Sequence, residues 1–198
     1  MKKGIAFFDF DGTITKKDTL LRFIRFSEGN WRFSLGFLSN IHFLVAYKLK
    51  LISNQVAKEK ILQYFFKGRS VATFNKKCAF FAHHILPDLI RPKALDEIQR
   101  LKNQNIVVVV VSASPENWIQ DWAQKQSVEL IASKLEVSEG KLTGRILGKN
   151  CHGPEKVRRI QDKYRIQEFD QIYAYGDTNG DKDMMELAHN SFYRPFRH

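Results

Sequence analysis

Short apolar runs, separated by segments of helical periodicity, dominate this chain of 198 residues. Residues 4–8 form one such run, at the start of a predicted strand 4–10, and residues 106–111 form another, an isoleucine followed by five valines. β-branched runs without polar alternation are typical of strands buried on both faces, as in parallel sheets. A third apolar run covers residues 172–175. We therefore expect three strands of a mainly parallel sheet.

Apolar residues between these strands recur at the spacing of a helix. Segments 92–101, 154–164 and 184–188 each place them on one helical face, and the first two begin with a proline, which suits a helix start. Residues 135–137 and 142–146, joined through a glycine, predict a β-hairpin. Strands that alternate with helices predict an α/β fold with a three-layer, Rossmann-like parallel sheet.

Residues 18–90 interrupt this alternation. They lack strand periodicity and predict several helices, so we expect an α/β core of residues 1–17 and 91–198 with an inserted all-α cap at 18–90. The longest uncharged stretch, residues 33–47, is 15 residues long. A membrane span needs roughly 20 apolar residues, so this stretch predicts a buried or interfacial helix.

Charge is distributed unevenly along the chain. The formal net charge is +11, yet residues 20–90 hold 11 lysines and arginines against three acids, together with 13 of the 25 aromatic residues. A basic and aromatic-rich insert fits nucleic acid, an anionic membrane surface or an anionic small substrate. The two cysteines form no disulfide framework and have no metal-site spacing, which favours a reducing cytoplasm.

Polar residues follow each of the three predicted strands. Asp9 and Asp11 end the first, Ser112 ends the second and Asp177 the third. Because the carboxyl ends of parallel strands share one edge of a sheet, where ligands bind, we expect these side chains to meet in one crevice. Lys156 and Asp181 are added to these four residues, so the candidate set is Asp9, Asp11, Ser112, Lys156, Asp177 and Asp181.

These residue types point to phosphoryl transfer. Crowded carboxylates repel one another unless a cation is present, and oxygen ligands without Cys or His favour Mg²⁺ over Zn²⁺. Ser112 and Lys156 are not suited to hold a metal, but a hydroxyl donor and an ammonium group suit a phosphate. A metal, phosphate donors and spare carboxylates together are the components of phosphoryl-transfer sites.

Four short motifs resemble those of the haloacid dehalogenase superfamily, in the same order. Residues 9–15, Asp-Phe-Asp-Gly-Thr-Ile-Thr, resemble its first motif, and Ser112 after the valine strand resembles the second. Lys156 resembles the third, and residues 176–181, Gly-Asp-Thr-Asn-Gly-Asp, resemble the fourth. They cover the chain apart from the insert, which looks like the helical cap of the phosphoserine phosphatase-like branch.

The resemblance implies a role for each position. Asp9 would be the nucleophile and form an aspartyl-phosphate. Asp11 would protonate the leaving oxygen and then activate water, and since family members that dehalogenate lack this second acid, Asp11 favours a phosphatase. Lys156 would also orient Asp9. The implied Mg²⁺ ligands are Asp9, Asp11 (through its backbone carbonyl), Asp177 and Asp181, and the implied phosphate-binding residues are Gly12, Ser112, Ala113 and Lys156.

The fourth motif departs from the pattern of that branch. Its members often carry Asn immediately before the last Asp, whereas this chain has Gly180 there and Asn179 one position earlier. The departure concerns a side-chain contact to the site and leaves the metal ligands in place.

Structural explanations compete for several of these residues. Asp9 and Asp11 also fit a solvated turn at a strand end, and Ser114 is expected to cap the next helix with Pro115 at its first position. His152 has no partner at metal-ligand spacing, which predicts a solvated or capping role. Lys156 also fits the exposed face of a basic helix.

The cap is expected to select the substrate. A phosphoserine phosphatase-type site needs an acid, for which Asp18 is the candidate, and a cation, for which Lys58 or Lys60 is. A basic, aromatic cap fits an anionic, partly apolar substrate better, and we hypothesise a phosphorylated lipid headgroup at a membrane surface. Residues 150–157 and 173–177 also resemble bacterial phosphatidylglycerophosphatase C-like proteins. The aromatic residues alternatively form only the cap's own core.

The sequence thus predicts a Mg²⁺-dependent phosphomonoester hydrolase with a small phosphate ester as substrate. The alternatives are a phosphoserine phosphatase-type enzyme for small metabolites and a non-catalytic basic binding module on the same fold. Nucleic acid is not expected as a partner, because no basic arm or recognition motif is visible. We expect a cytoplasmic protein with peripheral contact to the anionic inner face of the membrane.

Overall fold

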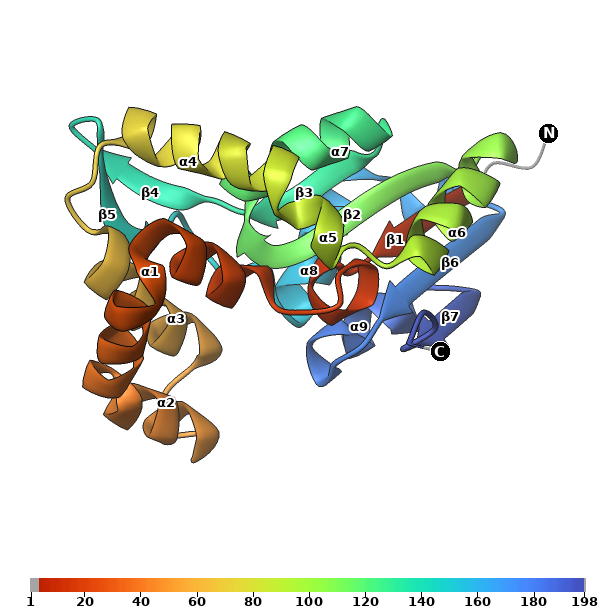
Figure 1. Ribbon diagram of the computed structural model, residues 1–198. Coiled ribbons are helices and arrows are strands. Elements are labelled where there is room, and N and C mark those ends of the chain that lie inside the picture. Colours follow the sequence, from red (N-terminus) through yellow and green to blue (C-terminus); the bar gives the residue numbers. More distant parts are fainter. Residues whose placement is uncertain (1–3, 198) are drawn as a thin grey trace.

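Five parallel strands form the central sheet of the computed structural model, which describes residues 4–197 (Figure 1). Their spatial order is β3-β2-β1-β6-β7. This confirms the predicted α/β class and the three predicted strands, and adds a strand at each edge. The bounds are β1 Gly4–Phe8, β2 Val107–Pro115, β3 Glu129–Ser133, β6 Gln171–Gly176 and β7 Asn190–Tyr193.

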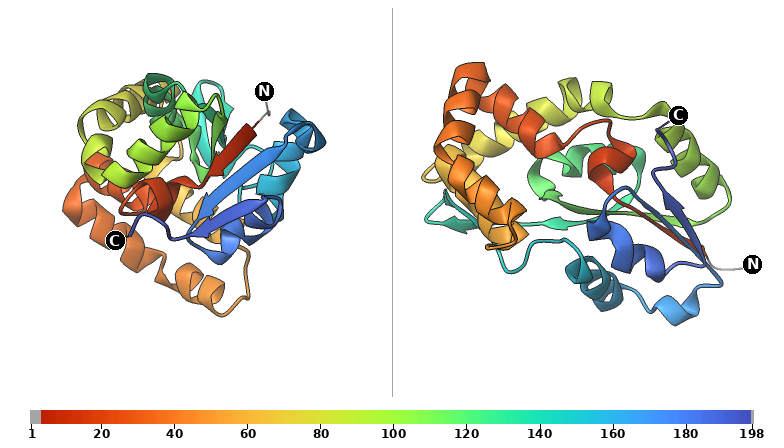
Figure 2. Two further views of the ribbon diagram at one scale, coloured as in Figure 1. Left: turned by 90° about the vertical axis from the view of Figure 1, so that its right-hand side faces the viewer. Right: turned by 90° about the horizontal axis from the view of Figure 1, so that it is seen from below.

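Strand β1 lies in the centre of the sheet, between β2 and β6, and both of its faces are covered. Ile5 and Phe7 belong to one apolar cluster, and Ala6 and Phe8 to another, as expected of side chains that alternate across a strand. Helices pack on both sides of the sheet and complete a three-layer core (Figure 2). These helices are α6 Pro92–Asn103, α7 Gln120–Gln126, α8 Pro154–Lys163 and α9 Lys182–Glu186.

Helices follow one another without a strand between β1 and α6. They are α1 Thr19–Ser39, α2 Ile41–Lys48, α3 Asn54–Phe66, α4 Val71–His84 and the short α5 Leu86–Leu89. We call α1 to α4 the cap helices, and they gather at one end of the sheet (Figure 1). The predicted hairpin is confirmed as β4 Leu135–Ser138 and β5 Lys141–Ile146, which lies against this helical region through hydrogen bonds with the α3–α4 connection.

Aromatic packing joins the cap helices to the sheet domain. The Phe23 ring of α1 stacks on Trp118 with a centroid separation of 4.7 Å, and meets Phe74 and Phe81 of α4 edge-on at 5.4 Å. Part of the aromatic content of the insert therefore forms its own core, as the structural alternative expected. Within residues 4–197, no helix has both the length and the apolar character to cross a membrane.

One local prediction is wrong. Strand β2 continues through Ser114 to Pro115, and a short 3-10 turn begins at Glu116, so Ser114 is not a helix cap. Its hydroxyl is instead bonded to the Asp11 carboxylate. A tertiary partner from the turn after β1 has replaced the local capping bond that sequence alone suggests.

Candidate active site

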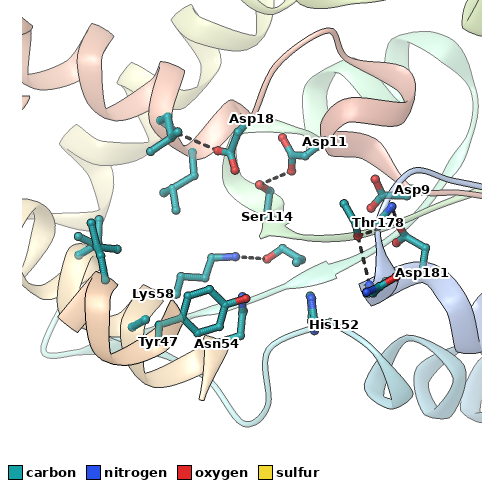
Figure 3. A pocket seen from close by; sticks show the side chains of 18 of the residues that line it. Asp9, Asp11, Asp18, Tyr47, Asn54, Lys58, Ser114, His152, Thr178 and Asp181 are labelled. Atoms are coloured by element: carbon teal, nitrogen blue, oxygen red, sulfur yellow. Dashed lines mark hydrogen bonds between the residues drawn. The ribbon is translucent and has the colours of Figure 1, made fainter. Parts of the chain in front are cut away.

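A crevice of about 560 Å³ lies between the carboxyl end of the sheet and the cap helices (Figure 3). Its volume is within the range of small-molecule sites. Charged side chains come from the sheet side, and the cap side is mainly apolar. The sheet-side residues include Asp9, Asp11, His152, Lys156 and Asp181, and the cap-side residues include Leu20, Leu21, Phe37, Leu44, Lys58 and Ile61.

Three buried carboxylates gather at the base of this crevice. One oxygen each of Asp9, Asp177 and Asp181 lies within 4.8 Å of the others. Each is 6% exposed or less, and Asp9 comes from a part of the sequence far from the other two. The structure therefore brings together the acids that end β1 and follow β6, as the sheet topology predicts.

Lys156 supplies the positive charge among these acids. Its Nζ donates to Asp9 Oδ1 at 2.6 Å, to Asp181 Oδ1 at 2.7 Å and to the Val111 carbonyl at 2.8 Å. The side chain is fully buried at the start of α8, so it does not belong to the exposed basic face considered above. These three contacts hold the ammonium group in place beside Asp9 and Asp181.

The electrostatics of the cluster differ from one acid to the next. Burial raises the pKa of Asp9, and it raises that of Asp177 together with the nearby Asp181 carboxylate. Burial alone would also raise the pKa of Asp181, but Lys156 outweighs it, so that this pKa is lowered. Lys156 and the Arg197 guanidinium, which pairs with Asp177, thus offset the effect of burial only in part, and a further cation would stabilise the ionised forms of Asp9 and Asp177.

The donor set fits Mg²⁺. The three carboxylates, one oxygen of each within 4.8 Å of the others, have no Cys or His among them and form an all-oxygen site. Burial raises the pKa values of Asp9 and Asp177, and the described cationic side chains offset this only in part. A bound cation would supply the positive charge that is missing.

The Asp11 carboxylate lies apart from the metal-type cluster. Its Oδ1 accepts from the backbone N–H of Thr19 at 2.6 Å, and its Oδ2 accepts from Ser114 Oγ at 2.6 Å. Thr19 is the first residue of α1. The carboxylate therefore connects the turn after β1 to the first cap helix, and it borders the crevice.

Gly12 is needed for both conformation and space. Its φ is +85°, and a Cβ at this position would lie 2.4 Å from Asp177 Oδ2. The turn after β1 thus brings its backbone directly against a second acid of the cluster. A side chain there would displace the carboxylate.

The second motif places different atoms in the crevice than its sequence suggests. Ser112 is fully buried, and its hydroxyl accepts from the Ser114 N–H at 3.0 Å. Ala113 and Ser114 border the crevice directly. The Ala113 carbonyl accepts from Nζ of Lys58 at 2.7 Å, which ties helix α3 to the end of β2. Phosphate binding by Ser112 stays a prediction.

The fourth motif is a capped turn. Asp181 Oδ2 accepts from the backbone N–H groups of Asp177 and Thr178 at 3.1 and 3.0 Å and from the Thr178 hydroxyl at 3.0 Å. These bonds fix the orientation of the carboxylate, whose other oxygen meets Lys156. Asp181 is therefore held on both sides.

The unusual Gly180 has a spatial explanation. A Cβ at Gly180 would lie 2.4 Å from Nε2 of His152, so the imidazole occupies the space that a side chain here would need. His152 also borders the crevice. Sequence reasoning missed this residue as part of the site, because it lies outside ligand spacing and only the Gly-for-Asn departure pointed to a local change.

Two arginines near the C-terminus were also missed. The Arg197 guanidinium pairs with Asp177 Oδ2, and Arg194 Nε donates to the Asp177 carbonyl at 3.1 Å. Neither belongs to a motif. Their contact depends on β7, an edge strand that the apolar pattern did not predict.

The candidate substrate residues of the cap divide into two groups. Asp18 and Lys58 border the crevice, and Asp18 also caps α1 by accepting from the Leu21 N–H at 3.0 Å. Desolvation in the crevice and the Asp11 charge raise the pKa of Asp18 to about 6. Lys60 lies elsewhere, with Nζ 5.1 Å from the centroid of the Phe43 ring.

Comparison with known proteins finds relatives over nearly the whole chain. The family model described as haloacid dehalogenase-like hydrolase matches residues 6–186. Protein CicA of Caulobacter vibrioides is 33% identical over 192 residues, which cover 96% of this chain and 85% of that protein.

Solved structures show the same fold at lower identity. A protein of unknown function from Bordetella pertussis Tohama I superposes with a TM-score of 0.83 at 20% identity, covering 96% of this chain and 89% of that one. A phosphoserine phosphatase in complex with its substrate superposes with a TM-score of 0.72 at 20% identity, covering 98% and 86%.

Proposed function

The chain belongs to the haloacid dehalogenase-like hydrolases, and we propose that it is a phosphatase that hydrolyses a phosphomonoester with the help of Mg²⁺. The observation that carries the proposal is the division of the buried acids. Asp9, Asp177 and Asp181 form one cluster, in which Lys156 is bonded to Asp9 and Asp181, whereas Asp11 is held separately by Ser114 and α1. This division supports the proposal that Asp9 attacks and that Asp11 moves protons.

The reaction we propose has two steps. Asp9 attacks phosphorus as the bond to the leaving oxygen breaks, Asp11 gives that oxygen its proton, and an aspartyl-phosphate remains. Asp11 then takes a proton from water, whose oxygen attacks phosphorus and releases phosphate and free Asp9. Lys156 keeps Asp9 in position through its 2.6 Å bond.

Mg²⁺ would be held by Asp9, Asp177, Asp181 and the backbone carbonyl of Asp11. When bound, it would neutralise charge on the phosphoryl oxygens. The groups proposed to bind those oxygens are Gly12, Ser112, Ala113 and Lys156.

For the substrate, we propose an anionic ester with an apolar part, such as a phosphorylated lipid headgroup, met at the cytoplasmic face of a membrane. The crevice supports this because its cap side offers Leu20, Phe37 and Leu44 next to the ammonium of Lys58. Apolar walls beside a lysine suit the apolar part and the negative charge of such an ester.

A phosphoserine phosphatase-type reaction is the second candidate. It is favoured by Asp18 and Lys58, an acid and a cation that border the same crevice. A zwitterionic phosphoester would place its ammonium group at the first and its carboxylate at the second.

Release of phosphate from p-nitrophenyl phosphate, with and without Mg²⁺, tests the reaction. Metal-dependent release that Asp9→Asn abolishes supports the phosphatase. Equal release by this variant refutes the nucleophile assignment, and no release by the wild type favours a non-catalytic binding module.

A panel of phosphatidylglycerol phosphate, phosphoserine and sugar phosphates then tests the substrate. We expect the highest kcat/KM with the lipid, and a larger KM for it in Lys58→Met with little change for p-nitrophenyl phosphate. Lys60→Met is the matched control, because Lys60 lies outside the crevice. Preference for phosphoserine would instead support the second candidate.

A further inference from the structure

An apolar surface is exposed at the end of α1, on α2 and in the loop that follows. Half of the large apolar side chains that residues 4–197 expose lie between positions 31 and 51. The fractions are high, with Trp31 80%, Leu38 66% and Leu49 63% exposed. We call this surface the docking face, and it consists of Trp31, Leu35, Leu38, Ile41, Val45, Leu49 and Leu51.

Helix α1 carries apolar side chains on two opposite sides in this region. Trp31, Leu35 and Leu38 have the i, i+4, i+7 spacing of one outward stripe, while Phe33 and Phe37 of the same helix pack against the core. A helix at the surface of a globular protein normally presents polar residues on its outer side. The inward residues account for the folding of this segment, and the outward stripe needs a different explanation.

The charges around the docking face are of one sign. No acid occurs between Glu28 and Glu59, whereas Lys48 and Lys50 are exposed beside the apolar residues. Arg32 is also exposed, although its guanidinium pairs with the buried Glu28 carboxylate at 3.4 Å. A partner that covers this face must offer an apolar interior and a negatively charged surface. A second copy of the same face would bring like charges together, and nucleic acid would leave the leucines in water.

We infer that the docking face inserts into the interface of an anionic lipid bilayer. Leucine and tryptophan side chains on a short helix would enter the boundary between headgroups and acyl chains, and the flanking lysines and arginine would meet anionic headgroups. The end of α1 and α2 lie away from the sheet, at one end of the molecule (Figures 1 and 2).

The same two helices form a wall of the crevice. Phe37, Leu44 and Tyr47 border it, and Figure 3 shows Tyr47 and Lys58 on the side opposite Asp9 and Asp181. Docking therefore places the apolar wall of the crevice beside the lipid. That this position delivers a phosphorylated headgroup to Asp9 rests on the proposed function, whereas docking itself is independent of catalysis.

Vesicle sedimentation without any substrate tests the docking face. The probes are vesicles of phosphatidylcholine alone and of phosphatidylcholine mixed with phosphatidylglycerol. We expect the wild type to bind the mixed vesicles more tightly, and added salt to weaken that binding. Leu38→Asp and Leu49→Asp should each weaken it about tenfold or more, since each removes one apolar side chain from the lipid.

The matched control is Val137→Asp, which places the same charge at an exposed apolar position of the β4–β5 hairpin. We expect it to bind like the wild type. Neither Leu38 nor Leu49 borders the crevice, so both variants should hydrolyse p-nitrophenyl phosphate at the wild-type rate, which also shows that they are folded.

Three results would overturn the inference. One is a wild type that binds neither vesicle, another is equal binding by Leu38→Asp and Val137→Asp, and the third is a wild-type dimer in sedimentation velocity that Leu38→Asp dissociates while vesicles are not bound. Vesicle binding by a protein that releases no phosphate would refute the proposed function and leave the docking face supported.

Discussion

The crevice and the docking face place charged and apolar side chains in opposite environments. In the crevice, charged groups are buried, and Lys156 makes hydrogen bonds to two of the three clustered acids. On the docking face, apolar side chains are exposed and the charges beside them are all positive. Buried charge is tolerated where rigid strands and helix ends hold its partners, whereas exposed apolar surface points to a partner outside the chain.

The two regions should therefore respond differently to substitution. A change in the crevice disturbs groups that solvent cannot compensate, so it should affect catalysis or folding strongly. A change on the docking face removes contacts that the isolated protein does not make. The substitutions below begin with the largest expected effect.

Asp9→Asn should abolish the activity of the crevice and leave the docking face unaffected. We expect phosphate release from p-nitrophenyl phosphate to fall by at least about ten-thousandfold, because the nucleophile is lost. Vesicle binding should be unchanged, and circular dichroism should confirm the fold. A loss of both properties would show that the two regions are not independent.

Lys156→Met tests the buried charge. It leaves Asp9 and Asp181 close together without their ammonium, so we expect the free energy of unfolding in urea to fall by about 3–5 kcal/mol. Lys60→Met, which removes an ammonium that lies over an aromatic ring, should cost less than about 1 kcal/mol. Similar losses in the two variants would argue against a special role for the buried pair.

Addition of Mg²⁺ should stabilise the protein without substrate. A ligand at a hundred times its dissociation constant contributes about 2.7 kcal/mol, which is visible as a higher Tm in calorimetry. The rise should be absent in Asp177→Asn and present in Leu49→Asp. An equal rise in both variants would place the metal outside the acid cluster.

Gly180→Asn tests the space next to His152. The added side chain meets the far end of an imidazole, which can rotate away, so we expect about 1 kcal/mol of destabilisation together with lower kcat/KM. His152→Ala combined with Gly180→Asn should restore the stability. If the double variant is as unstable as the single one, the imidazole is not the group that excludes a side chain.

The smallest effect is expected at Glu155, outside both regions. Its hydrogen bond with Arg158 lowers its pKa to about 2 from an ordinary 4.5, with further help from Arg159. A lowered pKa stabilises the fold above pH 4.5, and this contribution is lost as the pH falls towards 2. Glu155→Gln should remove about 1 kcal/mol at neutral pH and nothing at pH 2, since Arg158 is solvent-exposed and screened. Urea unfolding at both pH values measures this.

Much of the crevice could be predicted because its residues are tied to strand ends. The apolar runs identify β1, β2 and β6, and parallel strands bring Asp9, Asp11 and Asp177 to one edge. The edge strands β3 and β7 were missed. They are short, and β3 begins and ends with a polar residue, so their pairing comes from the neighbouring strand rather than from their own pattern.

The residues that escaped prediction are those whose role depends on a distant partner. In the sequence Ser114 fits a helix cap, and only the fold shows that the Asp11 carboxylate lies beside it. His152 has no role that the sequence reveals, and only the fold shows that Gly180 leaves room for its ring. The Arg197 contact with Asp177 needs β7 to bring the C-terminal segment to the site. Local propensity carries no information about such pairs.

The parallel sheet, the order of the motifs and the basic, aromatic character of the insert could be predicted from the sequence, because they depend on periodicity and composition. Which apolar residues of that insert are buried depends on how its helices pack. Phe37 and Leu38 are neighbours in the chain, yet one borders the crevice and the other is exposed. The physical reason is that a helix turns successive side chains to different sides, and packing against the core selects which side is covered.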